Sequence, residues 1–165
     1  MPYEFLVWLL AVLIQAAVLA INMHITLQFT DLENDNTNPH DAASAINSVV
    51  LWEYGLEGFL AIWLILNGKW FSALLPLAIL AFHIQQARWI LAWGWRFGRQ
   101  YIDVTEIYRQ VKPRRQQAVT KLIVYLFLFA WILYSFIYVM LHSLLTPAGK
   151  VAAREILQEA AATLH

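Results

Sequence analysis

The chain has 165 residues, of which 61% are hydrophobic and only 13% are charged, and its formal net charge is zero. Its mean hydropathy of +0.55 excludes a soluble domain of this size and indicates an integral membrane protein. Because cysteine is absent, the chain forms no disulfide, iron–sulfur centre or thiolate metal site. It also lacks a Gly-rich phosphate loop, a serine elbow and an HExxH helix, so we expect no enzyme, no cofactor and no nucleic-acid partner.

The first predicted helix covers residues 4–28. Its apolar run, 5–21, is interrupted only by Gln15 and continues through Asn22. Glu4 is the only charge at its start, so the run lacks the basic region of a signal peptide. We therefore expect this helix to stay in the protein as a membrane span.

Two less uniform helices are predicted at residues 46–66 and 70–92. Asn67 and Gly68 lie between them, and Asn-Gly is a strong turn signal, so we predict a tight helical hairpin. Both helices contain polar residues within their apolar runs. The pair either crosses the membrane fully, which gives four spans, or collapses into one span, which gives three.

The last predicted helix covers residues 119–144, around the uncharged run 122–141. At about 1.5 Å per residue, this run spans roughly 30 Å of hydrocarbon. The predicted fold is therefore an all-α integral membrane protein, a four-helix transmembrane bundle with a short central helical hairpin, over residues 1–146. For the tail, 147–165, two alternatives stay open, an amphipathic helix on the membrane surface and a solvated tail.

Positive charge is concentrated before the last helix, since most of the eleven Lys and Arg residues fall within 88–121. The positive-inside rule places this segment in the cytosol. With four spans, both termini then face the lumen and the loop at 30–45 is also cytosolic, whereas three spans would put the N-terminus in the cytosol. The loop carries four acidic side chains, and we expect it to attract the basic segment through weak exposed pairs. These residues are Asp31, Glu33, Asp35 and Asp41.

Two carboxylates, Glu53 and Glu57, are spaced i and i+4 and so share one face of the predicted helix 46–66. Charges within a span suggest function, in this case the polar path of a small transporter or proton channel. The interpretation we favour places both carboxylates near the membrane–water interface, with Trp52 and Tyr54 as aromatic anchors.

Further polar and aromatic residues receive structural interpretations. His83 and Gln86 are predicted to make polar contacts between helices rather than to form a proton or metal site. The other histidines show no ligand spacing, so no metal site is expected. The aromatic run in 125–138 is interpreted as lipid-facing or packed core.

Three segments of the sequence form a recognisable set. They are DLENDNTNP at 31–39, VLWEYGLEGF at 50–59 leading into LNGKWFSALLPLAILAFH at 66–83, and IDVTEIYRQVKPRRQQAVTKL at 102–122. In order and spacing they resemble the cornichon family of endoplasmic-reticulum export receptors. The first is similar to the family's acidic loop after the first helix, and the third to the stretch before the last helix in fungal and plant members. The likeness covers about residues 3–143.

The resemblance implies a non-enzymatic receptor in the endoplasmic-reticulum membrane, which binds transmembrane cargo proteins, links them to the COPII coat and cycles with COPII vesicles to the Golgi. In fungal members a short Ile-aromatic-Arg-x-aliphatic segment engages the coat. The matching coat-binding residues in this chain are Ile107, Tyr108, Arg109, Gln110 and Val111. Their apolar members would form a stripe on a short helix capped by Asp103 or Thr105.

Cargo is expected to bind the membrane-embedded faces of the first two helices, because the luminal loops are too short to contact a folded domain. Polar side chains such as Gln15 and Asn22 are the candidate cargo contacts, and membrane lipids surround the rest. Two alternatives stay open, an auxiliary subunit of one channel or receptor and a small transporter. The chain also departs from the family, which often has His where Glu57 stands and Pro where Ser48 and Trp52 stand.

Overall fold

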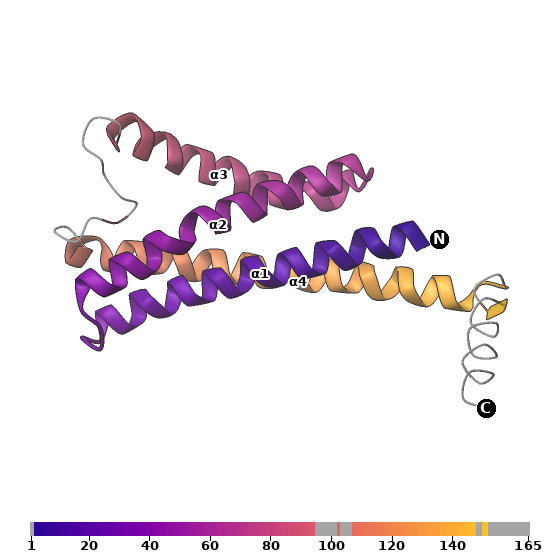
Figure 1. Cartoon of the computed structure of the whole chain (residues 1–165), viewed down its shortest axis with the longest axis horizontal. Coiled ribbons are helices and arrows are strands. Elements are labelled where there is room, and N and C mark those ends of the chain that lie inside the picture. The colour runs from indigo at the N-terminus through magenta and orange to yellow at the C-terminus, as the bar shows by residue number, and fades with distance from the viewer. Residues whose placement is uncertain (1, 95–101, 103–106, 148–149, 152–165) are drawn as a thin grey trace, which may run out of the picture.

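The computed structural model describes residues 2–94, 102, 107–147 and 150–151. Its four helices are α1 (Pro2–Glu33), α2 (Pro39–Leu66), α3 (Trp70–Gly94) and α4 (Ile107–Leu145) (Figure 1). By length and composition α1, α2 and α4 can each cross a membrane, and α3 is apolar over Trp70–Gln85. The predicted all-α membrane bundle is confirmed. The candidate caps Asp103 and Thr105 and most of the tail lie outside the described residues.

Three helices are longer than predicted at the end of the bundle where α4 begins. The predicted bounds 28, 46 and 119 become Glu33, Pro39 and Ile107. Hydropathy marks only the part of a helix that lies in hydrocarbon, whereas backbone hydrogen bonds continue through polar residues. The predicted short helix before the last span is therefore wrong as a separate element, since residues 107–118 form the first turns of α4.

The turn between α1 and α2 is built from polar residues that suit each position. Asp35 adopts a left-handed φ of 57°, and the amide of Asn36 donates to the carbonyl of Asp31 at 2.8 Å, as in a helix C-cap. Asn38 then caps α2 by accepting from the amide of His40 at 3.1 Å. This cap explains why the acidic loop ends in Asn-Pro, since Pro suits the first helical position.

The hairpin between α2 and α3 is confirmed. Gly68 has a φ of +71°, which is strained for residues with a side chain. Its amide donates to Ile65 at 3.0 Å, and the amide of Lys69 donates to Leu64 at 2.9 Å. These bonds satisfy the last carbonyls of α2 and turn the chain within three residues.

The helices pack in a fixed order in which α1 lies along both α2 and α4, and α2 lies along α3 (Figure 1). We call the end with the α2–α3 turn the hairpin end. The N-terminus also lies there, because Lys69 pairs with Glu4 at 3.1 Å and the rings of Phe5 and Phe136 are 5.3 Å apart. Both described chain ends therefore lie at the same end of the bundle (Figure 1).

The opposite end, where α4 begins and α1 turns into α2, is called the basic end. There Arg115 Nη1 lies 2.6 Å from Glu33 Oε2. The expected attraction between the basic segment and the acidic loop is thus confirmed. Because both side chains are partly exposed, this pair contributes only about 0–1 kcal/mol.

Buried apolar side chains form two clusters, one toward each end. The cluster at the hairpin end is Trp8, Ala11, Ile14, Val18, Leu60, Leu64, Ala73, Tyr125, Leu128 and Ile132. The cluster at the basic end is Ile25, Phe29, Leu32, Ala42, Ala43, Ile46, Ile102, Ile107, Val111 and Ala118. Alanine recurs in both clusters, and small side chains let helices approach closely. Close packing matters in a membrane because the hydrophobic effect does not drive helices together in lipid.

We predict four spans with both termini in the lumen. Glycosylation acceptors placed on short extensions at the N- and C-termini should both be modified in microsomes, and an acceptor inserted at 34–38 should not. The reason is that four helices with both ends at the hairpin end imply an even number of crossings. Modification of the C-terminal acceptor alone would instead support three spans.

Candidate functional site

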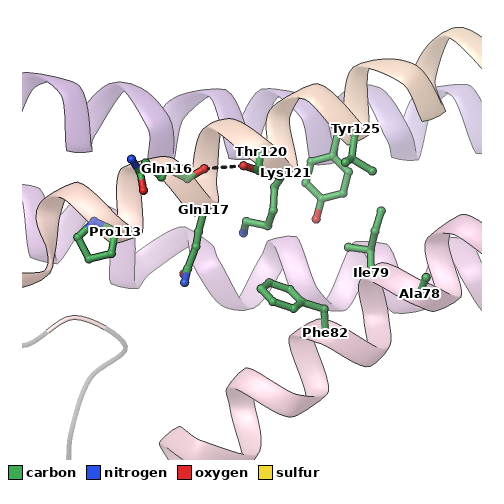
Figure 2. Close-up of a pocket in the computed structure, with 10 residues that line it drawn as sticks. Ala78, Ile79, Phe82, Pro113, Gln116, Gln117, Thr120, Lys121 and Tyr125 are labelled. Atoms are coloured by element: carbon green, nitrogen blue, oxygen red, sulfur yellow. Dashed lines mark hydrogen bonds between the residues drawn. The ribbon is translucent and has the colours of Figure 1, made fainter.

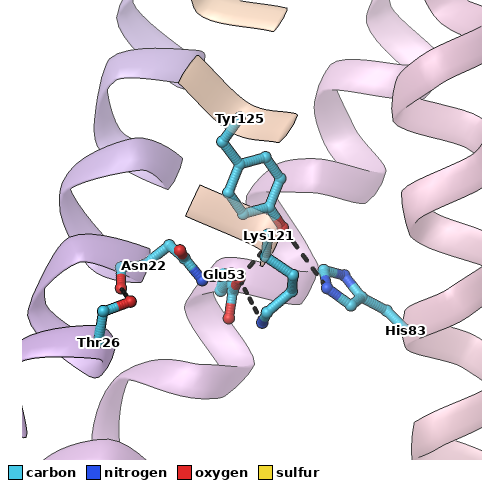
Figure 3. A network of polar contacts seen from close by, with 6 residues as sticks. All are labelled: Asn22, Thr26, Glu53, His83, Lys121 and Tyr125. Carbon is cyan, nitrogen blue, oxygen red and sulfur yellow. Dashed lines mark hydrogen bonds and ion pairs between the residues drawn. The ribbon is translucent and has the colours of Figure 1, made fainter. Parts of the chain in front are cut away.

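Polar side chains form a layer between the two apolar clusters, and Figure 3 shows all of them except Glu57. The layer contains Asn22 of α1, Glu53 and Glu57 of α2, His83 of α3, and Lys121 and Tyr125 of α4. All of these residues except Lys121 expose at most 1% of their surface. All four helices therefore contribute to one enclosed polar layer near the middle of the bundle.

The carboxylate of Glu53 is the centre of this layer. Its Oε1 accepts hydrogen bonds from Lys121 Nζ at 2.8 Å, from Asn22 Nδ2 at 3.1 Å and from the Tyr125 hydroxyl at 3.1 Å (Figure 3). A buried carboxylate is costly unless an opposite charge and hydrogen bonds replace its water. One oxygen atom thus fixes α1 and α4 against α2.

The network continues from Tyr125 to α3. The Tyr125 hydroxyl lies 3.5 Å from His83 Nε2, and the His83 ring stacks on Tyr54 with centroids 4.2 Å apart. The predicted role of His83 as a polar contact between helices is confirmed. The side chain of Gln86, its predicted companion, lies outside the described residues.

The interfacial interpretation of Glu53 and Glu57 is wrong. Both carboxylates are fully buried, and α2 begins at Pro39, about 20 Å of helix before Glu53. Trp52 is exposed on the other face. Within the described residues, the Glu57 carboxyl has no hydrogen-bond partner. Among these same residues, no three His, Asp or Glu side chains gather as metal ligands.

The two candidate cargo contacts face the interior. Gln15 is fully buried, and its Nε2 lies 3.4 Å from the carbonyl of Tyr125. Asn22 is equally buried and donates to Glu53. A cargo helix on the outside of the bundle would therefore not touch either side chain unless the helices separated.

The candidate coat-binding segment divides between two surroundings. Ile107 and Val111 expose only 1% and 5% and belong to the apolar cluster at the basic end, whereas Tyr108 is 63% exposed and Arg109 is also exposed. Gln110 is intermediate. Because the apolar stripe is mostly core, only Tyr108 and Arg109 present themselves fully to another protein.

Two hydrogen bonds with one side chain hold the backbone at Ile102, before this segment. Asn47 of α2 donates from Nδ2 to the carbonyl of Ile102 at 3.1 Å and accepts from its amide at 3.0 Å. The Ile102 side chain is buried in the basic-end cluster. Ile102, Ile107 and Val111 are thus all anchored in the basic-end cluster, and the burial of Ile107 and Val111 fixes the direction of Tyr108 on α4.

Sequence reasoning missed Lys121 and Tyr125 as members of the site. Along the chain, Lys121 belongs to the basic segment, and Tyr125 belongs to the aromatic run at 125–138. Two signals were available in the sequence. The i and i+4 spacing of Lys121 and Tyr125 at the start of the last span puts both on one helix face. In addition, a Glu inside a membrane span needs a cation as its partner.

Four helices that enclose a paired carboxylate define a helical, multi-pass membrane protein with a closed polar core. The cornichon family, described as "Cornichon protein", matches residues 5–134. The chain therefore belongs to the cornichon family, and the resemblance noted in its motifs is confirmed.

Relatives from plants and a yeast extend over most of the chain. It is 35% identical to "Protein cornichon homolog 3" of Arabidopsis thaliana over 134 residues, which is 78% of this chain and 90% of that protein. It is 28% identical to "ER-derived vesicles protein erv14" of Schizosaccharomyces pombe over 134 residues, 81% of this chain and 92% of that protein. No solved structure matches the chain.

We predict that Lys121→Met destabilises the bundle by about 3–5 kcal/mol, because it leaves the Glu53 carboxylate buried without a cation. Adding Glu53→Gln should restore most of this loss, since a neutral amide still accepts from Asn22 and Tyr125. Unfolding of the reconstituted protein in a denaturing-detergent titration measures both effects.

The matched control is Lys69→Met, which removes the half-exposed pair with Glu4 at the hairpin end. It should cost no more than about 1 kcal/mol. Equal losses for Lys121→Met and Lys69→Met would contradict the central role of Glu53.

Proposed function

We propose that this chain is a cargo receptor of the endoplasmic reticulum. It selects transmembrane proteins, links them to the COPII coat and travels with them toward the Golgi without carrying out a reaction. The observation that carries the proposal is its membership of the cornichon family together with the exposed Tyr108–Arg109 pair at the basic end. The relative named as a protein of ER-derived vesicles supports the same compartment.

The coat contact is assigned to the basic end because the positive-inside rule makes that end cytosolic. An aromatic ring and a guanidinium side by side suit an acidic pocket with an apolar wall, since Arg makes charge-assisted hydrogen bonds and Tyr supplies contact area. Ile107 and Val111 belong to this site as the buried residues that hold the pair in position, and Gln110 lies partly exposed beside them.

The cargo contact is assigned to the lipid-facing sides of α1 and α2. These carry large apolar side chains that the bundle leaves uncovered, namely Leu13, Met23, Leu27, Leu51, Phe59 and Ile62. Recognition between helices in lipid depends on close packing and on matched hydrophobic length. Gln15 and Asn22 contribute from within, by fixing the faces of α1 that point outward.

We predict that the double change Tyr108→Ala with Arg109→Ala lowers packaging into COPII vesicles by roughly thirtyfold, the effect of losing about 2 kcal/mol at a small interface. Binding to cargo should persist, because the two contacts lie in different compartments. A budding assay from endoplasmic-reticulum membranes measures packaging, and copurification measures cargo binding.

Tyr134→Ala is the matched control, because Tyr134 is 62% exposed on the same helix but outside the segment. It should be packaged normally. Ile107→Ala should instead lower the stability of the bundle, by about 2–5 kcal/mol, as large-to-small changes in a core do. Normal packaging of the double variant would refute the coat contact.

We also predict that cargo is recognised inside the membrane. Replacing the transmembrane segment of a bound cargo by an unrelated segment of equal length should abolish copurification, and replacing its luminal domain should not. If the chimera with the unrelated segment still copurified at the original level, recognition would lie outside the bilayer.

A further inference from the structure

A cleft of about 590 Å³ lies between α3 and α4 (Figure 2). Its walls are Ala78, Ile79 and Phe82 of α3, and Pro113, Gln116, Gln117, Thr120, Lys121, Val124 and Tyr125 of α4. The two helices touch through side chains, Trp131 Nε1 donating to Ser72 Oγ at 3.1 Å and the Tyr125 hydroxyl lying 3.5 Å from His83, but α3 joins the bundle mainly through α2. In a bilayer such a gap between spans is filled either by lipid or by a partner helix.

The dimensions of the cleft suit a lipid chain. From Pro113 to Tyr125 it follows α4 for about 18 Å, close to the thickness of one leaflet. Its volume of about 590 Å³ lies within the range of about 300–1,000 Å³ typical of small-ligand sites.

The polarity of the cleft changes along its length, as it does from the headgroup to the acyl chains of a phospholipid. Gln116, Gln117 and Thr120 line the part toward the basic end, and Figure 2 shows Gln117 pointing away from α4 into the gap. Ile79 and Phe82 of α3 reach in from the facing wall. Side-chain amides therefore line the part toward the basic end, and the deeper part combines the apolar side chains of α3 with Lys121, Val124 and Tyr125 of α4.

Positive charge continues from the polar part of the cleft toward the basic end. Arg109 and Lys112 are exposed and stand one turn before Pro113 and Gln116, at i and i+4, so they share the faces of α4 that line the cleft. Lys121 lies deeper and its charge is met by Glu53 at 2.8 Å. The mouth of the cleft is thus complementary to a phosphate and a second negative group.

We propose that this cleft binds an anionic phospholipid of the cytosolic leaflet. An acyl chain lies against Ile79, Phe82 and Val124, and the headgroup lies beside Gln116 within reach of Lys112. The proposal rests on neither the coat nor the cargo contact proposed above, although Arg109 at the mouth of the cleft is also a residue of the coat contact. The site makes the spacing of α3 from α4 depend on a lipid rather than on protein contacts alone.

The test reconstitutes the full chain in phosphatidylcholine vesicles that contain a trace of phosphatidylserine or phosphatidylcholine with a photoactivatable acyl chain. After irradiation, labelled peptides are identified by mass spectrometry. We expect labelling of the cleft residues of α3 and α4, about fivefold stronger with the phosphatidylserine probe, as one favourable Lys or Arg contact at the surface provides.

Two variants and their controls separate chain binding from headgroup binding. Ala78→Trp fills the cleft and should remove its labelling by both probes, whereas Leu126→Trp on the exposed face of α4 should not. Gln116→Glu places a negative charge at the mouth and should remove only the preference for phosphatidylserine. Gln28→Glu, the same change on α1 away from the cleft, should leave that preference intact.

Three outcomes would overturn the proposal. They are equal labelling by the two probes in the unchanged protein, cleft labelling that survives Ala78→Trp, and crosslinks from the cleft to a copurified membrane protein in place of lipid. The last outcome would assign the cleft to a partner helix. Because Gln116 is exposed, its variant tests the headgroup contact even if Ala78→Trp does not fold.

Discussion

The carboxylate of Glu53 cannot lose its water in the middle of a bundle unless the neighbouring helices replace it. Asn22, Lys121 and Tyr125 do so, and each of them reaches Glu53 Oε1 only at one rotation of its helix. The apolar contacts above and below this layer specify rotation much less strictly, because the helices are hydrophobic on nearly every side and lipid accepts any apolar face. The polar layer therefore sets the register in which the two apolar clusters form, and Tyr125 extends it to His83 on α3.

The sequence was sufficient for the helices and the hairpin, because hydropathy and the Asn67–Gly68 turn are local properties. It was not sufficient for burial. In a soluble protein the polar face of a helix identifies its exposed side, but Glu53 and Glu57 lie on an inner face and Leu51 and Trp52 lie outside. Assignment of the carboxylates to the interface failed for this reason. Lys121 can be recognised as the partner of Glu53 only when it is known that α2 and α4 meet. The periodic pattern of residues within one helix does not show which other helix it contacts.

Ile102 and the first turn of α4 combine an anchor with the surface that we propose as the coat contact. Ile102 is held by Asn47 through two hydrogen bonds, and Ile107 and Val111 fill the basic-end cluster. Tyr108 and Arg109 consequently project from a helix that is fixed on its other side. Such preorganisation reduces the conformational entropy lost on binding, so a contact of few residues can still have useful affinity.

The separation of Glu53 from its cation along the chain matters while the protein is being made. Asn22 precedes Glu53 by 31 residues, whereas Lys121 follows it by 68. At about 5–20 residues per second, a ribosome needs roughly 3–14 s to supply that lysine after the glutamate. During this interval α1 and α2 are already present with only the amide of Asn22 to meet the carboxylate. The bundle therefore cannot be completed until the last span arrives, because the ion pair joins α2 to α4.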